Sequence, residues 1–204
     1  MGLYAVNKKD FRILVVDDDD IAREVVGSVL SKEGYSVLSS RDGLQAISAL
    51  MTEDVGMVIT DFRMPGADGL EVLKSAVRST PDISVVIITA YGTLDSTLEA
   101  IAEGAYDYIT KPFKIQQIII VADRAFRRAK LLKENRDLRQ QLRDTYRDIK
   151  LLKAVTDSGN PCITADWIEK VEKLKSSNIL SLAEAEILKE RLIRGDGQQD
   201  FSSR

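Results

Sequence analysis

The side chains of this chain that are able to do chemistry stand just after short apolar runs. In chain order they are Asp17 and Asp18, then Asp61, Thr89 and Lys111. Carboxylates that converge repel one another unless a cation lies among them, and oxygen ligands without His or Cys select a hard ion such as Mg²⁺ or Mn²⁺. A carboxylate beside such an ion is able to attack phosphorus and form an acyl phosphate. Lys111 and the Thr89 hydroxyl would then stabilise the phosphoryl oxygens.

The elements that must bring these groups together are five apolar runs that alternate with helical patterns. The runs are 12–16, 35–39, 57–61, 84–88 and 106–110. This alternation predicts an α/β fold, in which a doubly wound parallel sheet of five strands carries helices on both faces. Such sheets bind ligands at the carboxyl ends of their strands. The predicted fold therefore places the chemical groups at one edge of the sheet.

The stretch 57–69 carries the strongest local signal. Its apolar run ends on Asp61, Pro65 and Gly66 mark a turn, and Asp68 is placed to cap the next helix. An alternative is that Asp61 is only a turn former at the end of a strand. The other groups at strand ends favour the chemical interpretation, because they follow in order along the same predicted sheet.

The composition excludes several kinds of chemistry. The chain has no histidine, which excludes His-based acid–base catalysis, His-metal sites and phosphohistidine chemistry on the chain itself. Cys162 is the single cysteine, so neither a disulfide framework nor a cysteine metal site is expected. No segment has the pattern of a signal peptide or reaches transmembrane length, and we therefore expect a cytoplasmic protein without membrane contacts.

A helical pattern without Pro or Gly continues far beyond the fifth strand, and residues 111–156 carry a net charge of +8 against −9 for residues 1–110. The heptad a positions are Asn135, Leu142 and Ile149, and the d positions are Leu131, Leu138, Thr145 and Leu152. Asn at an a position favours a parallel two-stranded register, in which Glu134 faces Arg139 and Asp148 faces Lys153 of a partner. We predict that residues 129–156 extend the fifth helix into a coiled coil and form a homodimer.

Three further segments follow the long helix. Residues 157–164 are predicted to be a linker, residues 165–195 a small α-helical hairpin, and residues 196–204 a disordered tail. Ser181 and Glu184 have the spacing of a capping box at the start of the second hairpin helix. This helix begins acidic, and an acidic leading end repels phosphates, so we expect that the hairpin contacts a protein partner and that the chain does not bind DNA.

The motifs V-V-D-D, V-I-T-D-F-R-M-P-G-A-D-G, I-I-T-A and Y-I-T-K-P-F resemble the receiver domain of two-component response regulators. The resemblance covers about residues 10–128, and we delimit the domain as 1–128. It implies a flavodoxin-like fold, Asp61 as the phosphoacceptor, and a metal site. The implied metal ligands are Asp17, Asp18, Asp61 and the backbone carbonyl of Arg63.

The resemblance also implies a switch. Thr89, Ala90 and Lys111 would contact the phosphoryl group, and Tyr108 matches the aromatic switch residue. A sensor histidine kinase or a phosphotransfer protein would phosphorylate Asp61, Thr89 would move inward, and the surface formed by residues 93–125 would change. The output would be altered dimer or partner contacts, and the chain itself is not expected to be an enzyme. Asp19 and Asp20 are expected to cap the first helix.

Alternative functions belong to other classes. The basic coiled coil or the tail could bind DNA in a transcriptional regulator, although a solvated coiled-coil surface accounts for the basic residues. No G-x-x-x-x-G-K-[ST] motif is present, which excludes an ATPase module of that kind in this sequence. The hairpin is similar to short oligomerisation hairpins of the SHOCT type. Asp17 and Asp19 imitate the nucleophile turn of a Mg-dependent phosphatase, but that interpretation leaves the M-P-G-A-D-G turn unexplained.

Overall fold

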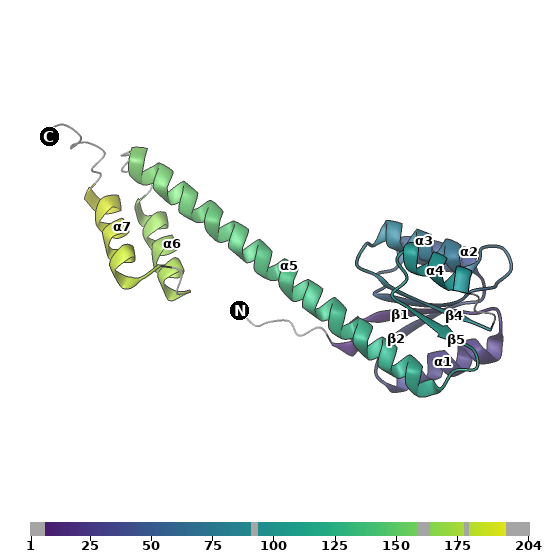
Figure 1. Ribbon diagram of the computed structural model, residues 1–204. Coiled ribbons are helices and arrows are strands. Elements are labelled where there is room, and N and C mark those ends of the chain that lie inside the picture. Colours follow the sequence, from purple (N-terminus) through teal and green to yellow (C-terminus); the bar gives the residue numbers. More distant parts are fainter. Residues whose placement is uncertain (1–6, 91–93, 159–163, 178–179, 195–204) are drawn as a thin grey trace. The chain divides into compact units, whose positions relative to one another are not determined.

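The computed structural model describes residues 7–90, 94–158, 164–177 and 180–194 (Figure 1). The chain divides into two compact units, Met1–Glu134 and Asn135–Arg204. The first unit contains the sheet, and the second contains the distal part of the long helix and two short helices. Each unit is described by itself.

The first unit is built on a five-stranded sheet whose pairings are all parallel. The strands are β1 (Arg12–Val16), β2 (Ser36–Ser40), β3 (Met57–Asp61), β4 (Ser84–Thr89) and β5 (Asp107–Thr110), in the order β2-β1-β3-β4-β5. Every residue of β3 and β4 is buried, because helices cover both faces of the sheet. The predicted doubly wound, flavodoxin-like fold is confirmed.

The helices cover the two faces unequally. The helices are α1 (Asp20–Lys32), α2 (Gly43–Thr52), α3 (Gly69–Ser79), α4 (Leu94–Ala102) and α5 (Ile115–Ser158), preceded by the 3₁₀ turn η1 (Lys8–Asp10). Figure 1 shows α1 and α5 on one face and α2, α3 and α4 on the other. Alternate strand residues supply the two cores, so that Ile13 and Ile59 pack with α1 and α5, while Leu14 and Val58 pack with α2, α3 and α4.

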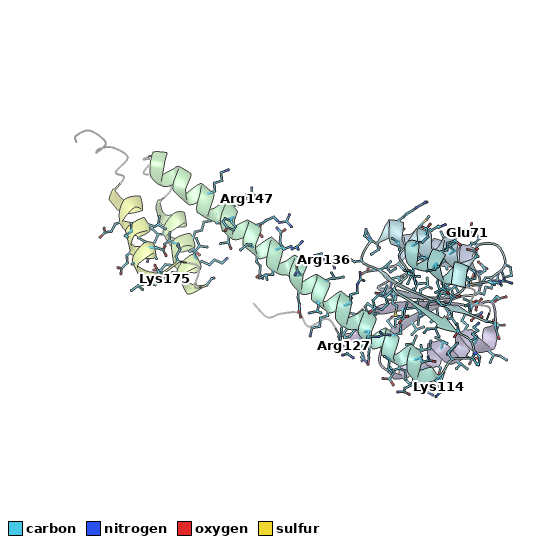
Figure 2. The ribbon with its side chains drawn as sticks, in the orientation of Figure 1. Glu71, Lys114, Arg127, Arg136, Arg147 and Lys175 are labelled. Atoms are coloured by element: carbon cyan, nitrogen blue, oxygen red, sulfur yellow. The ribbon has the colours of Figure 1, made fainter. Side chains whose placement is uncertain are left out.

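Side-chain caps fix where the helices begin. The Asp19 carboxylate accepts hydrogen bonds from the Ile21 and Ala22 amides at the start of α1, as predicted. Asp68 and Glu71 form a capping box at the start of α3, and Glu71 is labelled in Figure 2. These caps fix the first residues of α1 and α3.

The first turns of α5 are held to the sheet by apolar and polar contacts. Ile118, Val121, Ala122 and Ala125 are buried in the core that α1 and α5 share. Arg128 Nη1 donates to the Asp82 carbonyl at 2.7 Å and to Ser84 Oγ at 3.3 Å. The Arg128 guanidinium also lies 5.7 Å from the centre of the Tyr106 ring, which is within cation–π range.

A second contact ties α5 to the start of the chain. Tyr35 donates its hydroxyl hydrogen to Asp123 Oδ1 at 2.5 Å, and Lys8 Nζ lies 2.8 Å from the same oxygen. The rings of Phe11, Tyr35 and Phe126 pack edge to face around this contact. The first turns of α5 are therefore fixed from two sides.

The second unit contains the helical hairpin of α6 (Thr164–Ser176) and α7 (Leu182–Arg194). Val171 and Ala185 form its small buried core. The Ser181 amide donates to Glu184 Oε2 at 2.9 Å and the Glu184 amide donates to Ser181 Oγ at 3.3 Å, so the predicted capping box is present. The likeness to SHOCT hairpins stays a prediction.

The segments predicted beyond the sheet are a long helix, a linker, a hairpin and a tail. The extended fifth helix is present, and it runs to Ser158, while α6 begins at Thr164. These helix ends overlap the predicted linker 157–164, of which residues 159–163 lie outside the described residues. The tail 196–204 also lies outside them. The domain limits and the pairing of residues 129–156 as a coiled coil stay predictions.

Candidate functional site

The carboxyl ends of β1, β3 and β5 bring two carboxylates and one ammonium group together. Lys111 Nζ lies 2.6 Å from Asp61 Oδ1 and 3.0 Å from Asp17 Oδ2. Asp17 is 7% exposed and Asp61 is 8% exposed. Two nearly buried carboxylates therefore share one lysine at the edge where parallel sheets bind ligands.

Strand register brings Thr89 to the same edge. Asp61 pairs with Ile88 across β3 and β4, and Thr89 is the next residue of β4. The Lys111 amide donates to the Thr89 carbonyl at 2.7 Å, which joins the ends of β4 and β5. Thr89 is buried, whereas Ala90 beyond it is exposed. The structure thus brings Asp17, Asp61, Thr89 and Lys111 to one place, as the sequence predicted.

The turn after Asp61 is fixed by backbone contacts. The Arg63 amide donates to Asp61 Oδ2 at 2.8 Å, so this carboxylate is held from both sides. A Cβ at Gly69 would lie 2.3 Å from the Asp61 carbonyl oxygen, which means that only glycine permits α3 to begin so close to the strand end. Gly66 has φ +83, a left-handed conformation that glycine adopts without strain.

The electrostatics of the site favour additional positive charge. Burial raises the pKa of Asp17 above its ordinary value, although hydrogen bonds from Lys111 and from the Asp19 amide act in the opposite direction. Burial by itself would lower the pKa of Lys111, but its contacts with Asp61 and Asp17 outweigh burial and raise that pKa. The Lys111 side chain therefore keeps its positive charge. One ammonium group does not fully compensate the negative charge of two buried carboxylates.

The side chains at this edge of the sheet have the oxygen atoms that a hard divalent cation binds. Asp17 and Asp61 supply carboxylate oxygens, which are the ligands that Mg²⁺ prefers. Asp18 follows in sequence, and its side chain is exposed. Within the described ranges no three acidic, His or Cys side chains gather closely enough to form a metal site. The ligand roles predicted for Asp18 and for the Arg63 carbonyl therefore stay predictions.

Tyr108 lies on β5 with an unusual hydroxyl group. Its side chain packs against the core shared by α2, α3 and α4. The hydroxyl oxygen is buried and has no hydrogen-bond partner among the described residues. A buried polar atom without a partner costs free energy, and the hydroxyl group therefore does not help to hold the Tyr108 side chain in this position.

Some residues around the site have no motif that would reveal them. Arg23 Nη1 donates to the Asp17 carbonyl at 2.6 Å and so holds the loop that carries Asp17 and Asp18. The motif predicts Gly69 only as part of a turn, yet this residue sets the distance between α3 and Asp61. The spacing of Arg23 from Asp17, less than two helical turns, is the single signal that favours such a contact.

Comparison with known proteins agrees with this geometry. Residues 13–123 match the response regulator receiver domain, over more than half of the chain. A putative response regulator NtrX-like protein of Rickettsia bellii is 32% identical over 168 residues, which cover 81% of this chain and 33% of that protein. The DNA-binding transcriptional regulator NtrC of Klebsiella pneumoniae is 38% identical over 111 residues, 54% of this chain and 24% of that protein.

A solved structure shows the same fold. The beryllofluoride-activated NtrC4 receiver domain dimer has a TM-score of 0.54 and 28% identity to this chain, covering 57% of it and 96% of the NtrC4 domain. These matches confirm the resemblance predicted from the motifs. The chain spans about a third or less of the length of the curated relatives it matches.

The comparisons leave one expectation without support. We expected no contact with DNA from the acidic start of α7, but NtrC of Klebsiella pneumoniae is a DNA-binding regulator by name, so its relationship gives that expectation no support. The charge of one short helix is too local a feature to decide the point. No helix within the described part of the chain is long and apolar enough to cross a membrane.

Proposed function

Because this chain belongs to the response regulator receiver family, we propose that it is a phosphorylation switch whose phosphoacceptor is Asp61. The observation that carries the proposal is the pair of nearly buried carboxylates, Asp17 and Asp61, joined by Lys111 at the carboxyl edge of the sheet. Asp61 is fixed by the Arg63 amide and is therefore oriented before a phosphodonor arrives.

Each residue has a distinct part in the proposed transfer. Asp61 attacks the phosphorus of a phosphohistidine on a sensor kinase or phosphotransfer protein, and the donor histidine leaves with its electron pair. Lys111 compensates the charge of the oxygens that arrive at Asp61. Thr89, one position beyond the partner of Asp61, is placed to donate its hydroxyl hydrogen to the new phosphoryl group.

Asp17 and Asp61, with Asp18 and the Arg63 carbonyl, would hold Mg²⁺ or Mn²⁺. When bound, a divalent cation supplies charge neutralisation at the transferred phosphoryl group. The geometry supports this assignment, because a single ammonium group, that of Lys111, lies between the two nearly buried carboxylates of Asp17 and Asp61.

The proposed output passes through α4, β5 and α5. Tyr108 packs without a hydrogen bond for its hydroxyl group among the described residues, and this makes it sensitive to a movement of Thr89 on the neighbouring strand. Lys111 lies four residues before α5, so a change at the site reaches the helix that runs on to Ser158. The proposed result is altered homodimer contacts through residues 129–156, with no catalytic turnover by this chain and with the cytoplasm as its compartment.

Labelling with a small phosphodonor tests the proposal. Acetyl phosphate and Mg²⁺ should give an acid-stable, hydroxylamine-sensitive phosphoprotein with the native chain. Asp61→Asn should abolish the label, because it removes the nucleophilic oxygen. The matched control is Asp20→Asn, the same change at a carboxylate that is 86% exposed and outside the Lys111 contacts; it should keep the label.

The rival assignments predict different results. A phosphoryl label that survives in Asp61→Asn and disappears in Asp17→Asn would favour the phosphatase-like interpretation and contradict the proposal. Rapid release of inorganic phosphate without accumulation of the phosphoprotein would contradict the assignment as a switch, because a switch has to retain its phosphoryl group.

A further inference from the structure

Arg23 lies on the first turns of α1 and belongs to none of the motifs that mark the site. Its side chain is 17% exposed, whereas the Asp20 side chain is 86% exposed. Burying a long charged side chain costs rotamer freedom and hydration, so this burial requires compensating contacts. Two such contacts are present: Nη1 of Arg23 donates to the Asp17 carbonyl at 2.6 Å, and Nη2 forms an ion pair with Asp20 Oδ1.

The Asp17 carbonyl belongs to the peptide unit that joins Asp17 to Asp18. This unit is planar, so a contact that fixes its carbonyl oxygen also restricts the directions in which the two carboxylates leave the main chain. The Asp17 carboxylate is held separately, because Oδ1 accepts a hydrogen bond from the Asp19 amide at 3.0 Å and Oδ2 lies 3.0 Å from Lys111 Nζ. Arg23 therefore acts on the loop at a point that the contacts of the Asp17 side chain do not reach.

The shape of the guanidinium makes this contact directional. Its N–H donors form a rigid planar fork, whereas a lysine ammonium group is a compact charge at the end of a flexible stem. Asp20 is the first residue of α1, and its ion pair with Nη2 aligns the fork. The peptide between Asp17 and Asp18 is in this way connected to a helix, which is a rigid element.

Arg23 would affect a bound divalent cation in two ways that have opposite signs. Its positive charge repels the cation, and removing that charge would tighten binding. Its hold on the loop orients oxygen ligands, and contacts of this kind outside the ligand shell typically change metal affinity by about 10–100-fold. The Asp20 carboxylate lies against the guanidinium and reduces its repulsion at a distance. The positioning effect is therefore expected to exceed the repulsion.

We infer that Arg23 is a positioning residue for the divalent cation of the proposed phosphotransfer. It holds the peptide between Asp17 and Asp18 and so orients both carboxylates before a cation arrives. The inference rests on the proposed function and adds to it a residue that would contact neither the cation nor the phosphoryl group. A residue that served only to stabilise α1 would not change the affinity of the site for a cation.

Binding of Mn²⁺ to the full chain tests the sign of the effect, and it is measured without a phosphodonor from the electron paramagnetic resonance signal of free Mn²⁺. Arg23→Met should raise the Mn²⁺ dissociation constant about tenfold, because the loop loses its orientation. Arg23→Lys should raise it as well, since this variant keeps the charge and loses the fork. Arg78→Met, the same change at an exposed residue in the last turn of α3, is the matched control and should bind Mn²⁺ as the native chain does.

The dependence of labelling on Mg²⁺ separates positioning from a general loss of structure. With acetyl phosphate, Arg23→Met should require about tenfold more Mg²⁺ for half-maximal labelling of Asp61 and should keep the native rate at saturating Mg²⁺. Urea unfolding verifies that each variant is folded, and if Arg23→Met is unfolded, Arg23→Lys provides the same comparison. A lower rate at saturating Mg²⁺ with an unchanged Mg²⁺ requirement would overturn the inference.

The ion pair with Asp20 provides a further control. Asp20→Asn leaves the donation to the Asp17 carbonyl in place and should raise the Mn²⁺ dissociation constant less than Arg23→Met does, because exposed ion pairs contribute little. Unchanged or tighter Mn²⁺ binding in both Arg23 variants would overturn the inference and leave the labelling of Asp61 intact. Weaker Mn²⁺ binding in these variants, with no label on Asp61 in the native chain, would support the inference and contradict the proposed phosphoacceptor.

Discussion

At the scale of single residues, the site is defined by an imbalance of charge. Asp17 and Asp61 are both nearly buried, and the single ammonium group of Lys111 bridges them. Buried carboxylates are costly unless they are paired, so this arrangement is retained at the expense of stability. Such an arrangement is typical of a site that binds a further cation or changes its charge during function.

Replacing the lysine should expose this cost. Lys111→Met should lower the free energy of unfolding at pH 7 by about 2 kcal/mol, less than for a fully buried pair because the Lys111 side chain is 26% exposed. Lys114→Met, at an exposed position, is the control. The folded pKa of Asp17 is already above 3.8 and should rise further in the variant, so the folded state binds more protons than the unfolded state.

The sign of the pH dependence follows from this difference. Stability gained by protonation increases as pH falls, so the deficit of Lys111→Met relative to the native chain should shrink between pH 7 and pH 4. Urea unfolding of both proteins at several pH values measures this difference in the free energy of unfolding. A deficit that grows as pH falls would contradict the burial of uncompensated carboxylates.

Tyr108 provides a second test at this scale. Tyr108→Phe should leave stability unchanged or raise it by up to about 1 kcal/mol, because it removes a buried hydroxyl group without a partner among the described residues. Tyr146→Phe, at a side chain 66% exposed, should change nothing. If Tyr108→Phe destabilises the first unit by more than about 1 kcal/mol in urea unfolding, as expected for a lost hydrogen bond, the hydroxyl group is satisfied in solution.

At the scale of elements, α5 is the link between the site and the rest of the chain. Its first turns are held by Arg128 on the side of β4 and β5 and by Asp123 on the side of Tyr35 and Lys8. A helix is a rigid element, so a shift of its first turns is carried along its length. This property would allow a small change beside Lys111 to reach residues beyond the sheet.

The Arg128 contact should be measurable. Arg128→Met should lower the free energy of unfolding by about 1–2 kcal/mol and speed amide exchange in the first turns of α5, because two hydrogen bonds and the contact with Tyr106 are lost. Arg127→Met, at the exposed neighbouring position, is the matched control. Equal effects of the two substitutions would show that charge, and not the contact, is responsible.

Elements and site differ in how far the sequence predicts them. Strand ends were predictable because apolar runs stop at polar residues, and the caps Asp19 and Asp68 were predictable from spacing. The anchoring of α5 was not, since Arg128 and Asp123 form hydrogen bonds and an ion pair with residues about 40 to 115 positions away and no local pattern encodes such pairs. The direct contact of Lys111 with both carboxylates also depends on side-chain geometry, which spacing does not define.

At the scale of the whole molecule, the chain joins an acidic receiver unit to a basic helix. Residues 1–110 carry a net charge of −9 and residues 111–156 carry +8. A phosphoryl group on Asp61 would make the acidic part more negative and would alter its interaction with basic partners within a Debye length, about 8–10 Å. We propose that the output would combine a local movement at α4, β5 and α5 with this change of charge.

Phosphorylation should change amide exchange at a distance from Asp61. Acetyl phosphate with Mg²⁺ should alter exchange across residues 94–125, because the proposed switch would change the packing of α4, β5 and the start of α5. Asp61→Asn should show no such change under the same conditions, while Asp20→Asn should respond as the native chain does. A response of equal size in Asp61→Asn would mean that Mg²⁺ or acetyl phosphate acts elsewhere.

The most direct measurement locates the phosphoryl group itself. The chain is phosphorylated with acetyl phosphate and Mg²⁺, reduced with borohydride so that an acyl phosphate becomes an alcohol, digested and sequenced by mass spectrometry. We predict reduction of one carboxyl group, converting Asp61 to homoserine within the peptide that contains Arg63 and Pro65. Reduction at Asp17 or Asp18, or no reduced peptide from a phosphorylated sample, would contradict the assignment of Asp61 as the phosphoacceptor.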